Sequence, residues 1–189
     1  MKKSIFSALV LALVTLVSTN TYAQEFKDLD KSPMDQAAFP VSYKESDKAV
    51  KVTYGRPQLN ERPLAKLAPN GNVWRTGANE AAEITFYKDM MVGKTKVAKG
   101  TYSLFTIPGE KTWTIIINKD INVWGAYSYN EKNDVARTTA TVSASKEPIE
   151  AFSVAFEAEG TNIAMYMGWG DVVTKTILTP AATMSGLKK

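Results

Sequence analysis

The chain has 189 residues, 44% of them hydrophobic and 22% charged, with a formal net charge of +4 and neither cysteine nor histidine. These absences exclude Ser-His-Asp and Cys-His nucleophile pairs, histidine- or thiolate-ligated metals, and disulfides. The lysines are scattered rather than gathered in a stripe, so we expect no nucleic-acid partner. The composition still permits carboxylate chemistry, hydroxyl or lysine nucleophiles, oxygen-ligated metals and plain binding.

The first 23 residues have the order that is typical of a secretory signal. Lys2 and Lys3 precede an apolar run over residues 5–17, and small and polar residues then lead to Ala23. The run is shorter than the roughly 20 residues of a membrane span, although an uncleaved anchor is the alternative. We therefore expect residues 1–23 to be a signal peptide that is cleaved after Ala23. The prediction is a periplasmic or secreted protein with no transmembrane anchor after cleavage.

The rest of the chain divides into an arm, a domain and a tail. Residues 24–48 are polar and include two prolines, which predicts a loosely ordered N-terminal arm that leads into a first strand around residues 41–44. Residues 49–178 are expected to form one domain, because no internal repeat or low-complexity tract divides them. Residues 179–189 contain proline and glycine and predict a C-terminal tail that frays.

Within the domain, apolar and polar residues alternate with the period of a half-buried strand. Val50, Val52 and Tyr54 fall on one face of the first such segment, and glycine-containing turns separate several later ones. The result is an all-β prediction, a single antiparallel β-sandwich that is jelly-roll-like, with at most a short helical turn over residues 76–82. The further predicted strands are residues 83–88, 90–92, 95–97, 101–107, 113–118, 137–143, 149–157, 162–168 and 172–178.

Candidate binding residues concentrate in a polar and aromatic segment over residues 71–80. Trp74 offers a flat apolar face, Arg75 a planar fork suited to carboxylate or phosphate, and Asn79 and Glu80 hydrogen-bonding groups. A structural role is the open alternative. In that role Trp74 plugs the end of the core, Arg75 ties a neighbouring carboxylate, and Asn79 bonds its own backbone in a turn.

Two further positions are candidate neighbours of that segment. Arg56 follows a strand that ends at Gly55 and precedes a proline, so it is expected to project from a turn. Trp124 stands beside Gly125, which permits close approach of a backbone or a ligand. A saccharide ring can stack on Trp74 or Trp124, whereas burial in the core is the structural alternative for both indoles.

A pair of carboxylates is the catalytic device that this composition still permits. Glu80 and Glu83 lie nearest the aromatic segment, with Asp134 and Asp171 farther along the chain. A solvated strand face is the simpler interpretation of Glu83. Asp134 is also expected to pair with Arg137, three residues later.

No segment has the pattern of a metal site. The stretches 120–122 and 130–134 are rich in oxygen donors, but they lack the alternating acidic ligands of an EF-hand loop, and Lys132 opposes a cation. Calcium stays an open alternative, and we expect no metal and no cofactor.

Six short sequence motifs occur in order along the domain. They are Y-G-R-P, G-N-V-W-R-T-G-A-N-E-A-A-E-I-T-F, G-T-Y-S-L-F-T-I-P, W-T-I-I-I-N, W-G-A-Y and D-V-A-R. Together they resemble the bacterial envelope family catalogued as domain of unknown function 2911. The resemblance covers residues 50–178, and it implies export and one compact domain, with no established activity.

Three functional hypotheses follow. The first is a non-catalytic binding module for a small polar or glycan-like ligand. The second is a carboxylate-dependent hydrolase of envelope glycans, in which Glu80 acts as acid or base, and the third is a purely structural envelope component. No pattern indicates an oligomeric state. The residues expected to bind the ligand are Arg56, Trp74, Arg75, Asn79, Glu80 and Trp124.

Overall fold

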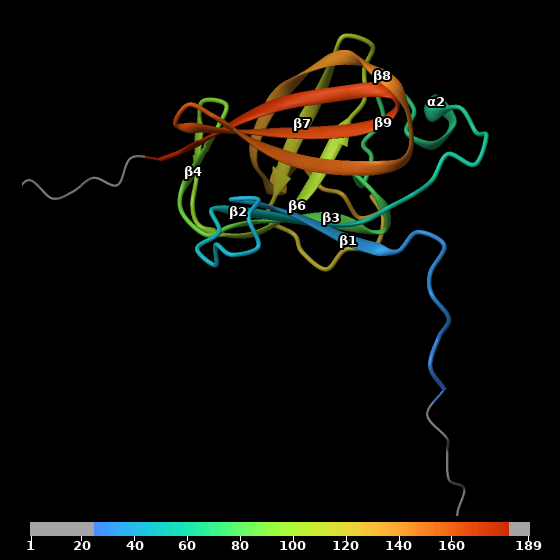
Figure 1. Ribbon diagram of the computed structural model, residues 1–189, viewed down its shortest axis with the longest axis horizontal. Helices are drawn as coiled ribbons and strands as arrows, with labels where there is room; N and C mark the ends of the chain where they lie inside the picture. The colour runs from blue at the N-terminus through green and yellow to red at the C-terminus, as the bar shows by residue number, and fades with distance from the viewer. Residues whose placement is uncertain (1–24, 182–189) are drawn as a thin grey trace, which may run out of the picture.

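The structure, a computed structural model, describes residues 25–181 (Figure 1). The predicted signal peptide, residues 1–23, and residues 182–189 of the predicted tail lie outside this range. Over residues 25–181, no helix has both the length and the apolar character that crossing a membrane requires.

Nine strands in the described part of the chain form one antiparallel sheet, which confirms the all-β prediction. The order across the sheet is β1-β2-β3-β6-β7-β8-β9-β4-β5, so most neighbours in the sheet are also neighbours in the sequence. Two short helical segments, α2 (Leu64–Leu67) and the 3₁₀ turn η1 (Glu131–Asn133), lie in connections. The strands are β1 (Met34–Phe39), β2 (Val50–Gly55), β3 (Ala78–Phe86), β4 (Met90–Val92), β5 (Thr95–Val97), β6 (Gly100–Ile107), β7 (Thr112–Asn118), β8 (Asp134–Glu159) and β9 (Asn162–Pro180).

The sheet folds over itself because its two longest strands are irregular. The register between β8 and β9 shifts between Ala144 and Ile149 and again between Ile149 and Ser153, and such irregularities bend strands. Beyond the shift, β8 reaches the chain that follows β2, where Gln58 pairs with Ala151 in an isolated bridge. Figure 1 shows β8 and β9 lying over β1, β2 and β3. One continuous sheet therefore supplies both layers of the sandwich.

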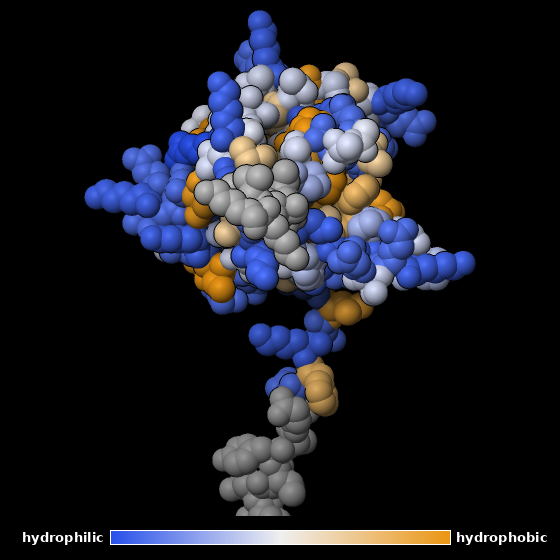
Figure 2. All heavy atoms as spheres, turned by 90° about the vertical axis from the view of Figure 1, so that its left-hand side faces the viewer, coloured by the Kyte–Doolittle hydropathy of each residue, from blue (hydrophilic) through white to orange (hydrophobic). Residues whose placement is uncertain are grey.

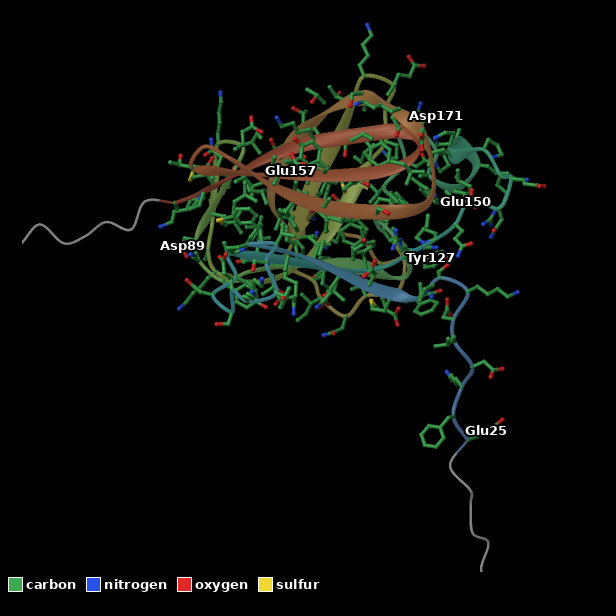
Figure 3. All side chains as sticks on the ribbon, in the orientation of Figure 1. Glu25, Asp89, Tyr127, Glu150, Glu157 and Asp171 are labelled. Atoms are coloured by element: carbon green, nitrogen blue, oxygen red, sulfur yellow. The ribbon has the colours of Figure 1, made fainter. Side chains whose placement is uncertain are left out.

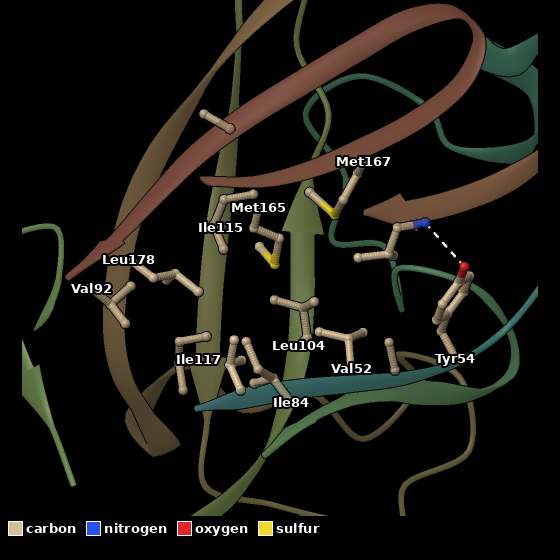
Figure 4. Close-up of a cluster of buried hydrophobic side chains, with 14 of the residues drawn as sticks. Val52, Tyr54, Ile84, Val92, Leu104, Ile115, Ile117, Met165, Met167 and Leu178 are labelled. Atoms are coloured by element: carbon tan, nitrogen blue, oxygen red, sulfur yellow. Dashed lines mark hydrogen bonds between the residues drawn. The ribbon is translucent and has the colours of Figure 1, made fainter. Parts of the chain in front are cut away.

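The main core lies between these two layers (Figure 4). Alternation along the strands turns Val52, Ile84 and Leu104 inward from one layer, and Met165 and Leu178 meet them from β9. None of these side chains is exposed, and burial of each contributes about 1.5–3 kcal/mol. The chain has no cysteine, so this core holds the fold without disulfides.

The prediction of a first strand over residues 41–44 was wrong. The strand is Met34–Phe39, which pairs along its whole length with β2 and forms the edge of the sheet. Ala37 and Phe39 contact the main core, whereas Val41 and Tyr43 are 68% and 90% exposed. The loosely ordered arm that we expected over residues 24–48 therefore includes a paired strand. Contact with the core, rather than local β-propensity, decides its position.

The helical turn considered for residues 76–82 does not form. β3 begins at Ala78, and Asn79 adopts a φ of 63°, a left-handed conformation that asparagine tolerates better than most residues. From Ala82 onward every second residue, namely Ala82, Ile84 and Phe86, points into the main core. Their burial outweighs the helical preference of the local Glu-Ala-Ala-Glu sequence.

Candidate functional site

A cavity of about 190 Å³ opens beside β1, β2 and β3. Thr53 and Glu83, which line it, alternate with the inward-facing Val52 and Ile84, so the cavity lies on the side of the sheet away from the main core. We call it the Glu80 cavity. Its lining consists of Met34 of β1, residues 53–55 of β2, Glu80, Ala81 and Glu83 of β3, and Asn122.

Trp124 lies directly beside Glu80. The two residues form an antiparallel bridge, and the backbone N–H groups of Ala81 and Gly125 donate to Val123 O and Asn79 O, at 2.9 and 3.0 Å. Directly paired residues on antiparallel strands point to the same side. Glu80 is exposed, and Trp124 is 60% exposed. The structure thus brings together three of the predicted site residues, Asn79, Glu80 and Trp124.

The loop that carries Trp124, residues 119–133, is fastened to the sheet by side chains. We call it the Trp124 loop. Glu83 Oε1 accepts a hydrogen bond of 2.9 Å from the N–H of Asn122, and Asn118 Oδ1 accepts one of 2.9 Å from the N–H of Asp120. Asn118 Nδ2 in turn donates to Asn130 O at 3.0 Å. Both ends of the loop are therefore tied to the strands beneath it.

These anchoring residues belong to a polar row that crosses five strands. Thr53, Glu83, Ser103, Asn118 and Asp134 stand in direct register on β2, β3, β6, β7 and β8. The Ser103 hydroxyl is fully buried and has no hydrogen-bond partner within the described residues. The row supplies the floor on which the Trp124 loop lies.

A small apolar cluster fixes the remainder of the loop. Ala81, Phe105 and Ile116 are buried on the outer face of β3, β6 and β7. Val123 and Tyr129 of the loop pack against this cluster, and the rings of Phe105 and Tyr129 meet edge to face at 5.1 Å. Such aromatic pairs contribute about 0.5–1.5 kcal/mol beyond their burial. The loop is thus held by both polar and apolar contacts.

The expected ion pair between Asp134 and Arg137 is confirmed. Arg137 Nε donates to Asp134 Oδ2 at 2.6 Å, and Tyr129 Oη donates to the same oxygen at 2.7 Å. Burial, followed by the hydrogen bond to Asp134, raises the pKa of Tyr129 to about 12. The hydrogen bond to Asp134 also raises the pKa of Arg137. Asp134 also accepts a hydrogen bond of 2.8 Å from Asn118 Nδ2, so its carboxylate joins β7, β8 and the Trp124 loop.

Trp74 lies in the main core rather than at the cavity. Only 6% of it is exposed, and its indole stacks on Trp169 with ring centroids 5.3 Å apart. Phe152 and Trp113 pack edge to face against the same ring at 5.1 and 6.0 Å. This position fits the structural alternative, in which Trp74 fills the core, and leaves no free indole face for a ligand.

Arg75 is also absent from the cavity lining. Its Nε donates to the carbonyl of Gly77 at 3.1 Å, and its own carbonyl accepts from the N–H of Ala82 at 2.9 Å. These bonds stabilise the turn into β3. The tie to a neighbouring carboxylate that the structural alternative expected is not among the ion pairs of residues 25–181.

Arg56 joins the two layers of the sheet. Its Nη1 lies 3.1 Å from Asp35 Oδ2, and its Nε and Nη2 donate to Phe152 O and Ser153 Oγ at 3.1 and 2.8 Å. The neighbouring Tyr54 hydroxyl accepts a 3.0 Å hydrogen bond from the backbone of β8, drawn as a dashed line in Figure 4. Burial raises the pKa of Tyr54. Arg56 thus adjoins the cavity through Tyr54 and Gly55, but its guanidinium faces β8.

The Glu80 cavity is acidic. Glu80 and Glu83 are its charged residues, and in the described part of the chain neither takes part in an ion pair. Nearby, hydrogen bonds from the Ser32 backbone and the Asn79 side chain lower the pKa of Asp30. No group of three or more acidic side chains within residues 25–181 has a spacing that could hold a metal ion.

The four carboxylates considered for catalysis occupy different places. Glu80 and Glu83 share one wall of the cavity, Asp134 belongs to the Arg137 network, and Asp171 lies on β9 in the other layer (Figure 3). Glycosidase carboxyl pairs instead flank the scissile bond, about 5–10 Å apart. The observed arrangement suits hydrogen bonding to a ligand better than acid and base attack from two sides.

Of the residues that line the cavity, sequence reasoning had proposed only Glu80 and Glu83 as functional. Among those that it missed, Met34 belongs to the segment that was expected to be a loose arm, and Asn122 lies 39 residues from the Glu83 side chain that it binds. The period of β2 and β3 could have indicated the cavity wall, because Thr53 and Glu83 both fall on the face opposite the core. The approach of Met34 and Asn122 depends on tertiary structure alone.

Comparison with known proteins supports the family assignment. The family described as Protein of unknown function (DUF2911) matches residues 32–177, well over half of the chain. Searches of curated proteins and of solved structures each found no match. The matched range begins just before β1 and ends within β9, so it takes in the whole Glu80 cavity and the Trp124 loop. The chain therefore belongs to the DUF2911 family of proteins of unknown function.

Proposed function

We propose that the protein is a non-catalytic binding module for a small polar or glycan-like ligand, with its site at the Glu80 cavity and the adjoining face of Trp124. The observation that carries this proposal is the bridge between Glu80 and Trp124, which sets an exposed indole beside an exposed carboxylate at the wall of a cavity.

The residue types suit a saccharide. An indole presents a large rigid apolar surface at small entropic cost, as the carbon face of a sugar ring requires. The carboxylates of Glu80 and Glu83 accept hydrogen bonds from hydroxyl groups. The cavity has the volume of roughly six water molecules at about 30 Å³ each, which suits one ring or headgroup. A longer ligand would extend over Trp124.

The position of the site also supports binding. Figure 3 places Tyr127, from the Trp124 loop, at the end of the molecule where the N-terminal segment leaves β1, and Asp89 at the opposite end. Tyr127 is 86% exposed and adds a second aromatic surface to the loop. The face around β4 instead carries many long hydrophilic side chains between small apolar patches (Figure 2). Exposed aromatic groups on a firmly held loop are typical of binding surfaces.

We place this activity outside the cytoplasm. The order of charged, apolar and small residues before Ala23 supports export, and a cysteine-free chain is indifferent to an oxidising compartment. Cell fractionation of the full-length protein, with N-terminal sequencing of the mature form, tests this placement. A mature chain that retained residues 1–23 would contradict it.

Thermal shift against a library of saccharides and small polar compounds tests the binding function. A ligand at about 100 times its Kd adds about 2.7 kcal/mol of stability. We expect that gain to be lost in Trp124→Ala and reduced in Glu80→Gln, and to persist in Tyr43→Ala, which removes an exposed aromatic residue that does not line the cavity. Stabilisation that survives Trp124→Ala would place the ligand elsewhere.

A further inference from the structure

The Glu80 cavity is negatively charged in a chain whose overall charge is positive. Glu80 and Glu83 are the charged groups of its lining, and no lysine or arginine among the described residues lines it. The formal net charge of the chain is +4. The acidic character of the cavity is therefore a local property.

The basic residue that directly follows the cavity lining in the sequence is directed elsewhere. Arg56 follows the cavity residue Gly55, but its guanidinium is occupied by Asp35, Phe152 O and Ser153. Glu83 uses Oε1 to hold the N–H of Asn122 and forms no ion pair within residues 25–181. Neither carboxylate of the cavity lining therefore has a cationic partner among the described residues.

Trp124 adds a second attraction for a positive charge. A cation is attracted to the face of an indole, and this indole adjoins Glu80 through the β-bridge. An anionic ligand would meet repulsion from both carboxylates, since like charges brought together oppose binding. A neutral ligand would form no ion pair with Glu80 or Glu83.

From this geometry we infer that the ligand is a saccharide that carries a free, protonated amine. The ammonium group pairs with the exposed Glu80 at the edge of the cavity, and the sugar ring lies on the adjoining Trp124 indole. This inference rests on the proposed function and specifies its ligand. A sugar ring is favoured over a lysine side chain because Trp124 and Tyr127, three residues apart on one loop, expose broad aromatic surface rather than a narrow channel.

Two matched probes test the inference by isothermal titration calorimetry. The glucosamine trisaccharide and its fully N-acetylated counterpart differ in charge because acetylation removes the amine. At about pH 6 an amine with a pKa near 8 is protonated. We expect the free amine form to bind at least about tenfold more tightly. This preference should fall when NaCl is raised from about 50 to about 500 mM, because screening weakens exposed charge pairs.

Variants assign that preference to the cavity. Glu80→Gln should reduce the discrimination between the two trisaccharides, whereas Glu157→Gln, which removes the same charge from an exposed position on β8 in the other layer, should preserve it (Figure 3). Equal or tighter binding of the acetylated form would overturn the inference and leave the binding function standing. Tighter binding of a lysine peptide than of the amino sugar would also overturn it. If neither trisaccharide binds and no library compound stabilises the protein, the proposed function fails as well.

Discussion

The carboxylate of Glu83 and the backbone N–H of Asn122, 39 residues apart in the sequence, form a hydrogen bond of 2.9 Å that joins β3 to the Trp124 loop. The same carboxylate lines the Glu80 cavity. Glu83 therefore contributes both to the wall of the candidate site and to the position of the loop that carries its aromatic residues.

Replacing Glu83 by alanine should loosen this loop without unfolding the protein. The bond is exposed to solvent, so its loss should cost only about 0.5–1.5 kcal/mol. Hydrogen exchange should show faster exchange at the Asn122 amide. Glu83→Gln keeps an oxygen acceptor and serves as the matched control. Unchanged exchange in Glu83→Ala would show that the apolar contacts of the loop suffice.

The two indoles Trp74 and Trp124 should respond oppositely to the same substitution. Trp74→Ala should lower the free energy of unfolding by about 3–5 kcal/mol, because it leaves a cavity among Trp113, Phe152 and Trp169. Trp124→Ala should change it by no more than about 0.5 kcal/mol, because that side chain is largely exposed. Urea denaturation of both variants measures the difference. Similar losses in the two would contradict the assigned positions.

The ion pair between Arg56 and Asp35 should contribute little by itself. The two side chains are 40% and 38% exposed, so a double-mutant cycle with alanine should yield a coupling energy of about 0.2–1 kcal/mol. Arg56→Ala alone should cost more, since it also removes the bonds to Phe152 O and Ser153 Oγ. Arg56→Lys keeps the charge but not the fork, and should recover only part of the loss. Full recovery would mean that charge alone matters.

Tyr129 should titrate late. Its pKa in the folded protein is about 12, against an ordinary value of 10.0, so folding favours the neutral phenol. The resulting stabilisation is complete below about pH 10 and is lost as the pH rises through about 12. Ultraviolet titration of the phenolate should show this late component, and Tyr129→Phe should remove it. In Asp134→Asn the pKa should fall towards 10, because the carboxylate that opposes ionisation is gone. A Tyr129 that titrated near 10 in the folded wild-type protein would contradict the network.

Strands were predicted well wherever one face of the chain meets the core. Val52 and Tyr54, or Phe152 and Phe156, alternate with exposed or partly exposed residues. Successive side chains of a strand point to opposite faces, so a strand with one buried face has alternating apolar and polar residues, and this alternation can be recognised in the local sequence. The predicted strands 90–92 and 95–97 coincide with β4 and β5. Local alternation is sufficient in these places because each residue's environment depends on which face it occupies.

Irregular strands were harder to predict. Residues 137–143 and 149–157 were expected to be separate strands, but both belong to β8, and residues 162–168 and 172–178 both belong to β9. At Gly170, which has a φ of 59°, the chain bends without reversing. A turn signal and a bend signal use the same residue types, so the local sequence does not distinguish them.

The candidate site was predicted in part. Asn79, Glu80 and Trp124 come together because β3 pairs with the Trp124 loop. Trp74 was expected either in the site or in the core, and its contacts with rings distant in the sequence, such as that of Trp169, 95 positions later, place it in the core. Flanking polar residues make its segment resemble a surface loop. Long-range contacts of this kind have no local signature.

Three polar attachments of the Trp124 loop use its main-chain atoms, at Asp120, Asn122 and Asn130, which engage side chains of the sheet. Main-chain groups are common to all residues apart from proline's missing N–H, so the exposed side chains of Trp124 and Tyr127 can be exchanged while these attachments persist. Substitutions at these exposed positions can therefore change which ligand the loop binds with little effect on folding. Libraries randomised at the exposed positions Trp124 and Tyr127 would be a practical route to binders of new saccharides on the same scaffold.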